Sequence, residues 1–174
     1  GGAQIPSDMV IAGIGIHPSV ELAASAGLVV SDGIVVDAEL RTNSPDIYAA
    51  GDSAMFPYAA LGRPMRVEHW DKAAIQGKQA GRNMAGANEP YVHMPYFFSD
   101  LFEFGYEAVG DVDARLETFT DWEEENRKGV VYYRADGRVR GAMMCNVWGQ
   151  VDAARQLIKA STQATPANLR GAIR

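Results

Sequence analysis

The chain has 174 residues, of which 47% are hydrophobic and 22% are charged, and its formal net charge is −6. This length and composition predict a globular protein of one or two domains and exclude collagen-like, coiled-coil and wholly disordered classes. The negative net charge also argues against a nucleic-acid partner, because binding to phosphates needs many cationic contacts.

The first residues of the sequence predict a strand, a turn and a helix in succession. An apolar strand is expected at 8–12 and a Gly-rich turn at 13–18. A helix is expected at 20–26, with Pro18 in its first turn, where the missing N–H of proline has no cost. This order is typical of an α/β sheet.

Further strands are predicted up to residue 50. Two small strands are expected at 28–30 and 33–37, on either side of a turn signal. Residues 47–50 have the pattern of a buried strand that stops at Gly51 and Asp52. That strand would deliver Asp52 to the edge of the sheet.

Small residues recur at helical spacing between Trp70 and Met84, which predicts a helix over 70–84. Because these side chains are small, a neighbouring element could approach this face closely, and we expect it to be packed. The stripe consists of Ala73, Gly77, Ala80 or Gly81, and Met84. Breaker residues at 86–90 end the helix and predict a junction between two domains, 1–90 and 91–174.

The second half changes to period-two alternation, which predicts antiparallel strands. These strands are expected at 105–110, 115–120, 130–133 and 139–145. The pair Asp136-Gly137 between the last two is a strong signal for a tight hairpin. A helix at 148–160 should cover the sheet, and a short last helix or a tail is expected at 167–173. The second half is therefore predicted to be a small α+β module.

The turn at 13–18 imitates a dinucleotide-binding fingerprint. It has Gly13 and Gly15, and Asp37 follows at about the distance expected of a ribose-binding acid. However, Pro18 stands where a third glycine would allow close packing of helix on strand. A complete phosphate-binding unit is not expected here, whereas a tight turn that brings backbone close to a ligand is.

The most specific motif covers residues 42–52. Thr42 is followed after six residues by Ala49-Ala50-Gly51-Asp52, which matches the second flavin-binding motif of FAD reductases with two dinucleotide-binding domains. A carboxylate that follows glycine at a strand end can accept a hydrogen bond from a ribityl hydroxyl, and glycine permits the close approach. The plainer alternative is a strand end with a capping aspartate.

A second pair of motifs extends this resemblance. Arg66-Val67-Glu68-His69-Trp70 leads into the helix at 70–84, and Tyr96-Phe97-Phe98-Ser99-Asp100 follows it. Together with 42–52, these motifs resemble the C-terminal portion of ferredoxin-reductase-like and apoptosis-inducing-factor-like flavoproteins. These are FAD-dependent pyridine nucleotide oxidoreductases, and the resemblance spans about residues 8–160.

The resemblance implies roles for individual residues. The helix that begins near Trp70 would point free backbone N–H groups around His69 and Trp70 at the pyrimidine end of the flavin, where the helix dipole favours negative charge. Phe98 would lie beside the flavin in place of the family's tryptophan, and Glu68 would border the nicotinamide. The turn at 13–18 would lie near both rings. The expected cofactor-binding residues are Gly13, Gly15, Pro18, Gly51, Asp52, Glu68, His69, Trp70 and Phe98.

The implied fold is part of an FAD-binding fold with two dinucleotide-binding domains, followed by a small α+β interface domain with an antiparallel sheet. Complete members carry Gly-rich units for FAD and NAD(P)H, which these residues lack. The intact protein would be an FAD-dependent NAD(P)H reductase. We expect the 174-residue chain alone to be inactive and to purify without bound flavin.

Electrons are expected to leave the flavin directly, because the His-Pro-Thr…Glu pair of the related disulfide reductases is absent. The acceptor would be a small ferredoxin-like iron–sulfur protein or a quinone-like compound. The alternative is a non-enzymatic module in which residues 91–174 mediate dimer or partner contacts, and a homodimer is one such assembly.

Other residue types carry little further chemistry. No catalytic acid or base is assigned, and His93 is expected to be a packed or interfacial histidine. No metal site is expected, because His17, His69 and Cys145 lack the spacing of zinc ligands. A single cysteine cannot form an internal disulfide, so a reducing cytoplasm is the expected location. No apolar run approaches the roughly 20 residues of a membrane helix, and no membrane partner is expected.

Overall fold

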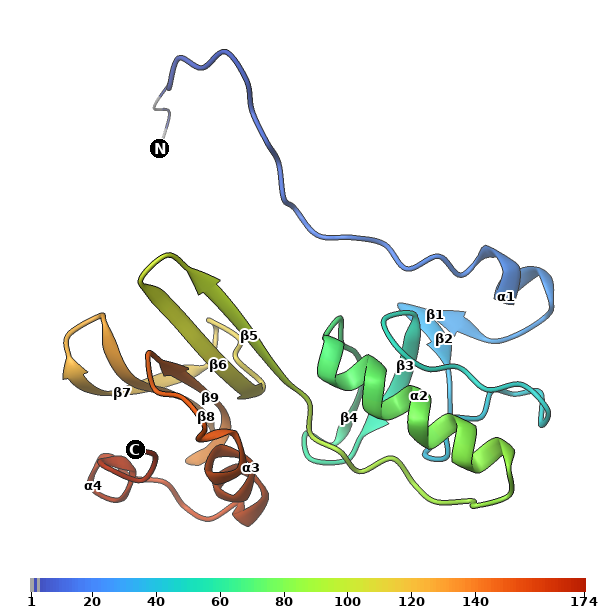
Figure 1. Ribbon diagram of the computed structural model, residues 1–174. Coiled ribbons are helices and arrows are strands. Elements are labelled where there is room, and N and C mark those ends of the chain that lie inside the picture. The colour runs from blue at the N-terminus through green and yellow to red at the C-terminus, as the bar shows by residue number, and fades with distance from the viewer. Residues whose placement is uncertain (1, 3) are drawn as a thin grey trace.

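The computed structural model describes residue 2 and residues 4–174, which form two β-sheets and four helices (Figure 1). The first sheet has the strand order β1-β2-β3-β4, and the second has the order β5-β6-β9-β8-β7. Strands β2 and β3 are parallel, whereas every other pair is antiparallel. The predicted combination of a partial α/β fold with an α+β module that carries an antiparallel sheet is confirmed.

The first sheet and its helices come from residues up to 84. The elements are α1 (Glu21–Ser25), β1 (Val30–Ser31), β2 (Gly33–Val35), β3 (Ala54–Tyr58), β4 (Arg63–Arg66) and α2 (Trp70–Met84). α1, β1 and β2 overlap the helix and the two small strands that the sequence predicts. Pro18 lies before Val20, the N-cap residue of α1, and therefore outside the first helical turn in which it was expected.

The strand predicted at 8–12 is absent. These residues are exposed, with Ile11 86% accessible, and the chain before α1 runs away from both sheets in Figure 1. A β-strand is stable only where a neighbouring strand completes its backbone hydrogen bonds. No strand of the described residues lies beside this segment, so its apolar pattern does not produce a strand.

The strand predicted at 47–50 is also wrong. Of these residues, Tyr48 pairs with Arg41 through an isolated bridge. The Thr42 hydroxyl and the Thr42 amide both donate to the Ile47 carbonyl, at 3.0 and 2.9 Å, and close a tight loop in place of an extended strand. The true strand at this position is β3, which begins just after Asp52.

Helix α2 has the predicted bounds but buries a different face. Gly77, Gly81 and Met84 are exposed, so the prediction of a packed small-residue stripe is wrong for most of it. The buried residues of α2 are Lys72, Gln76, Ala80 and Asn83. Three of these four are polar, because their side chains bond to backbone groups of loops that pack against the helix.

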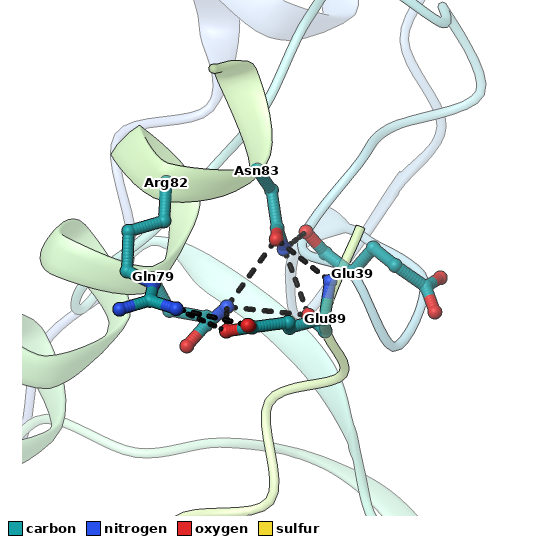
Figure 2. Close-up of polar contacts among 5 residues, drawn as sticks. All are labelled: Glu39, Gln79, Arg82, Asn83 and Glu89. Atoms are coloured by element: carbon teal, nitrogen blue, oxygen red, sulfur yellow. Dashed lines mark hydrogen bonds and ion pairs between the residues drawn. The ribbon is translucent and has the colours of Figure 1, made fainter. Parts of the chain in front are cut away.

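The C-terminal end of α2 is fixed by a polar network around Asn83 (Figure 2). The Asn83 amide nitrogen donates to the carbonyls of Glu39 and Glu89, at 2.7 and 2.9 Å, and its oxygen accepts from the Glu89 amide. Arg82 pairs with the Glu89 carboxylate at 2.7 Å. One buried side chain thus ties the helix to the loop before Arg41 and to the segment that leads into the second sheet.

The second sheet contains the four predicted strands and a fifth, at 96–101, that the sequence did not predict. Its elements are β5 (Tyr96–Leu101), β6 (Phe104–Gly110), β7 (Glu117–Glu124), β8 (Lys128–Ala135), β9 (Arg138–Cys145), α3 (Val151–Ala160) and α4 (Pro166–Leu169). Asp136 and Gly137 both have positive φ, 52° and 70°, as a two-residue hairpin turn of this type requires. Helix α3 packs on β6 and β9, as expected of a covering helix.

Trp148 was expected to begin this covering helix but lies three residues before α3. Its ring lies over Gly105, where an added Cβ would come within 2.5 Å of the indole. The core is continuous between the two sheets, because Phe56, Tyr91 and Met144 belong to one cluster of buried side chains. The domain junction near residue 90 falls in the connection between α2 and β5 and stays a prediction.

Candidate flavin site

The turn at Gly51 and Asp52 is held against the first half of α2. The Gly51 amide donates to Gln76 Oε1 at 3.1 Å. The Lys72 ammonium donates to the Gly51 carbonyl at 2.7 Å and to the Ala54 carbonyl at 3.1 Å. Lys72 and Gln76 lie four residues apart on one helical face, and both are 0% exposed. Two buried side chains therefore fix the backbone on both sides of Asp52.

Glycine at position 51 suits this geometry. Its φ is +78°, a conformation that residues with a Cβ adopt rarely. An added Cβ would lie 3.7 Å from the Ala73 Cβ, which is ordinary contact, so the backbone angle and not the available space favours glycine. The turn brings Asp52 to the surface next to the beginning of α2.

Asp52 lines a cavity of about 480 Å³ together with residues of the predicted Gly-rich turn. The cavity is formed by Ile16, His17, Pro18, Ser19, Asp52, Ser53 and Ala73. Pro18 is thus brought beside Asp52, whereas Gly13 and Gly15 are exposed and do not line this cavity. The Asp52 carboxylate is exposed and free to accept hydrogen bonds from a ligand.

A second cavity, of about 340 Å³, lies at the start of α2 on the side of β5. Its walls are Glu68, His69, Trp70, Asp71, Tyr96, Phe97 and Phe98. Phe98 is 56% exposed, and its ring stacks on that of Tyr96 at a centroid distance of 6.4 Å. The predicted site residues therefore fall into two groups, which line separate cavities on either side of the first turn of α2.

Arg66 links the two groups. Its Nη1 donates to the Asp52 carbonyl at 3.2 Å and to Glu68 Oε1 at 2.6 Å, and its Nε donates to Asp32 Oδ1 at 3.3 Å. The Arg66 side chain is 8% exposed. The distance between the Asp52 turn and the Glu68 segment is thus set by one buried guanidinium.

The start of α2 leaves backbone donors available. The first intrahelical hydrogen bond runs from the Ala73 amide to the His69 carbonyl at 2.9 Å, so the amides of residues 70–72 precede it. No side chain caps this end. These amides and the positive end of the helix dipole favour a negatively charged group nearby.

Sequence reasoning missed Lys72, Gln76 and Arg66. Lysine and glutamine on a helix are usually solvated, and only the packing of the turn against α2 shows that these two are buried. Spacing offers a weak signal, because Lys72, Gln76 and Ala80 follow each other at intervals of four residues.

His93 is half-buried between the two sheets, as expected of an interfacial histidine. His93 Nε2 lies 2.6 Å from Asp71 Oδ2, a contact that the sequence did not indicate. Asp71 Oδ2 also accepts from the Tyr96 amide at 3.2 Å and lies 3.5 Å from the Arg155 guanidinium. Asp71 thus joins α2, β5 and α3 in one polar cluster.

His69 follows Glu68 directly, and its side chain packs against strand β5. Its ring stacks on Phe97 with a centroid distance of 4.4 Å, and Nδ1 is 2.9 Å from the Glu68 carbonyl. Because a carbonyl can only accept, Nδ1 carries the proton and Nε2 of the neutral ring is an acceptor. Burial lowers the pKa of His69 below the ordinary 6.5.

We expect Phe97→Ala to raise the pKa of His69 toward 6.5 in this chain, because it uncovers the ring and removes the desolvation that disfavours the imidazolium. NMR titration of the imidazole protons measures it, with exposed Phe102→Ala as the matched control. The pKa of His69 is lower in the folded state than in the unfolded state, so protonation favours unfolding. The contribution of the neutral ring to stability is therefore complete above about pH 6.5 and is lost as the pH falls below it. A wild-type His69 that titrates at or above 6.5 would contradict this prediction.

The described residues hold no group of three or more His, Cys, Asp or Glu side chains that could bind a metal ion. Cys145 is buried, and burial raises the pKa of its thiol. None of the helices in the described part of the chain combines the length and apolar character needed to cross a bilayer.

The chain combines a Gly-Asp turn held against the start of a helix with a module that carries an antiparallel sheet, and the comparisons match both parts to pyridine nucleotide oxidoreductases and their relatives. Residues 1–77 match the family model described as pyridine nucleotide-disulphide oxidoreductase. Residues 80–125 match the model of the C-terminal region of mitochondrion-associated apoptosis-inducing factor. The chain belongs to this oxidoreductase family, in the group of ferredoxin reductases and apoptosis-inducing factors.

Curated relatives match almost the whole chain. The ferredoxin–NAD(+) reductase component of the anthranilate 1,2-dioxygenase system of Burkholderia cepacia is 36% identical over 167 residues, which are 95% of this chain and 41% of the relative. Apoptosis-inducing factor 1 of Dictyostelium discoideum is 36% identical over 172 residues, 90% of this chain and 32% of the relative. The chain thus spans less than half the length of these relatives.

Solved structures also match almost the whole chain. The ferredoxin reductase for the CYP199A2 system of Rhodopseudomonas palustris superposes with a TM-score of 0.84 at 30% identity, over 96% of this chain and 41% of that one. The covalent putidaredoxin reductase–putidaredoxin complex gives a TM-score of 0.83 at 30% identity, over 95% of this chain and 40% of that one.

Proposed function

We propose that this chain is the C-terminal part of an FAD-dependent NAD(P)H oxidoreductase that passes electrons from NAD(P)H through the flavin to a small iron–sulfur protein. The observation that carries the proposal is the Gly51–Asp52 turn, which Lys72 and Gln76 hold against the start of α2. The Asp52 carboxylate lines a cavity on one side of the first turn of α2, and the helix N-terminus with its free amides lies at the cavity on the other side. This donor and acceptor set suits a ligand with hydroxyl groups at one end and a ring that becomes negative on reduction.

The residues present fit the flavin chemically. The amides of residues 70–72 precede the intrahelical bonds of α2 and have no acceptor within the helix, and Trp70 and Asp71 line the cavity at the start of α2. Orphaned donors of this kind favour acceptors such as ring carbonyls. The exposed Asp52 carboxylate complements them, because it offers acceptors to hydroxyl groups.

Each group has a proposed task. Asp52 accepts a hydrogen bond from the ribityl chain, and the backbone of His69 and Trp70 faces the pyrimidine end. Phe98 and Glu68 border the nicotinamide side, and Pro18, which lines the Asp52 cavity, brings backbone close to the ligand, whereas Gly13 and Gly15 have no part in this arrangement. When bound, the flavin supplies hydride acceptance from nicotinamide and electron delivery to the acceptor.

A ferredoxin-like acceptor is favoured over a quinone-like one by the relatives. The Pseudomonas putida relative, 38% identical over 109 residues, is named putidaredoxin reductase, and a solved structure of such a reductase contains putidaredoxin. No side chain of this chain needs to carry a proton or form a bond to substrate for such transfer. Positioning and charge are the contributions expected of its residues.

The proposal is tested on the full-length polypeptide that contains this chain. It should purify with flavin absorption bands, and anaerobic addition of NADH or NADPH should bleach them. A reduced ferredoxin should then form when an oxidised one is added. The 174-residue chain alone should purify colourless. A full-length protein that binds no flavin would refute the proposal.

A further inference from the structure

Lys72 carries a positive charge in the interior of the protein. Its side chain on α2 is 0% exposed, and its ammonium bonds to the carbonyls of Gly51 and Ala54. The ammonium also lies 5.1 Å from the centre of the Phe56 ring. None of the ion pairs among the described residues includes Lys72.

Burying an ammonium costs free energy, because the charge loses its hydration. Two carbonyls and an aromatic face stabilise an ammonium partly, yet a neutral donor would satisfy the same carbonyls without desolvating a charge. Burial lowers the pKa of Lys72 to about 8, whereas the charges of Asp52 and Glu68 oppose this shift. Lys72 is therefore mainly protonated at neutral pH.

The Lys72 charge lies close to a second source of positive potential, the N-terminus of α2. Lys72 is in the first turn of α2, among the residues whose amides precede the intrahelical bonds. Ala73, the next residue, lines the cavity of Asp52. The ammonium and the helix N-terminus thus act on the same side of the Gly51–Asp52 turn.

We propose that Lys72 is a positioning residue of the flavin site, which fixes the Gly51–Asp52 turn and whose charge stabilises the negative reduced ring. This inference rests on the proposed function. Hydride transfer oxidises NAD(P)H to NAD(P)⁺ and gives the ring one proton and two electrons, so the reduced ring gains one negative charge. A fixed positive charge nearby stabilises that product relative to the oxidised ring.

The test is the flavin reduction equilibrium of the full-length flavoprotein, measured against a redox dye. Lys72→Met keeps the length of the side chain and removes its charge. We expect it to lower the ratio of reduced to oxidised flavin about tenfold at a fixed potential, which equals about 30 mV for a two-electron couple. Lys78→Met, on the exposed side of the same helix, is the matched control and should leave the ratio unchanged.

The pH dependence separates a charge effect from a packing effect. The difference between wild type and Lys72→Met should persist below the pKa of Lys72 and shrink as the pH rises above about 8. Asp52, Glu68, Arg66 and His69 also act on this position, and all four are present in both proteins. They therefore contribute equally to both titrations.

The outcomes are distinct. If Lys72→Met does not fold, Lys72→Gln, which keeps a hydrogen-bond donor, carries the same measurement. Bound flavin with an unchanged reduction ratio in the folded variant overturns the role of Lys72 and leaves the proposed function intact. A full-length wild type without flavin overturns both. A shift that does not depend on pH overturns the role of charge.

Discussion

Asp52→Asn should weaken FAD binding by the full-length polypeptide about tenfold to a hundredfold. Hydrogen bonds to a charged group contribute about 1.5–3 kcal/mol, and about 1.4 kcal/mol corresponds to a factor of ten in affinity. The amide keeps the size of the side chain but loses the negative charge. The turn itself should survive, because Lys72, Gln76 and Arg66 hold it through the backbone and not through the Asp52 carboxylate.

Fluorescence titration of the flavin-free full-length protein measures this effect. Asp46→Asn is the matched control, because Asp46 is an exposed aspartate of the same loop and should leave the affinity unchanged. An Asp52→Asn variant that binds FAD as tightly as wild type would leave Asp52 as a capping residue, the plainer reading of the sequence.

The elements predicted well from sequence are those whose signals are local. Helix α2 begins and ends where its periodicity and the breakers after it indicate, and the hairpin at Asp136-Gly137 needs two residues with positive φ. Both signals lie within a few residues of the element that they describe. The same is true of the Gly51–Asp52 motif, whose backbone conformation depends on glycine.

The strands of the first sheet were harder to predict because strands depend on distant partners. The apolar segment at 8–12 remains unpaired in the described chain, whereas β3 and β4 pair with each other despite Pro57 and Pro64, which face each other in the register. Proline normally argues against a strand, because it cannot donate to the ladder. The pattern alone therefore favoured the wrong segment.

The site was predicted in part, and what was missed is long-range. The sequence pointed to Asp52, Pro18, His69 and Phe98, which do line the two cavities. It indicated the burial of Lys72 only weakly, through the four-residue spacing of Lys72, Gln76 and Ala80. The contact that buries Lys72 joins residues 21 apart in sequence, because it depends on how the Gly51 turn packs on α2.

The polar cluster of Asp71 shows the same limitation and has a measurable consequence. Asp71 and His93 are 22 residues apart, and Asp71 and Arg155 are 84 apart. Their side chains are 14%, 24% and 18% exposed, so the cluster is mostly shielded from water. Arg155 also donates from Nε to the Met94 carbonyl at 2.9 Å, which ties α3 to the connection before β5.

We expect Asp71→Ala to lower the free energy of unfolding of this chain by about 3 kcal/mol, because removing one partner of a largely buried ion pair leaves the other charge uncompensated. The variant also loses the acceptor of the Tyr96 amide and an acid in the first turn of α2, where the helix dipole favours one. Urea unfolding followed by circular dichroism gives the difference at constant m-value.

Asp152→Ala is the matched control, since Asp152 is also a first-turn acid paired with Arg155, at 3.0 Å, but is 85% exposed. The control should change stability by less than about 1 kcal/mol. Equal losses in the two variants would mean that Asp71 acts as one more surface charge and that its cluster does not hold the two sheets together.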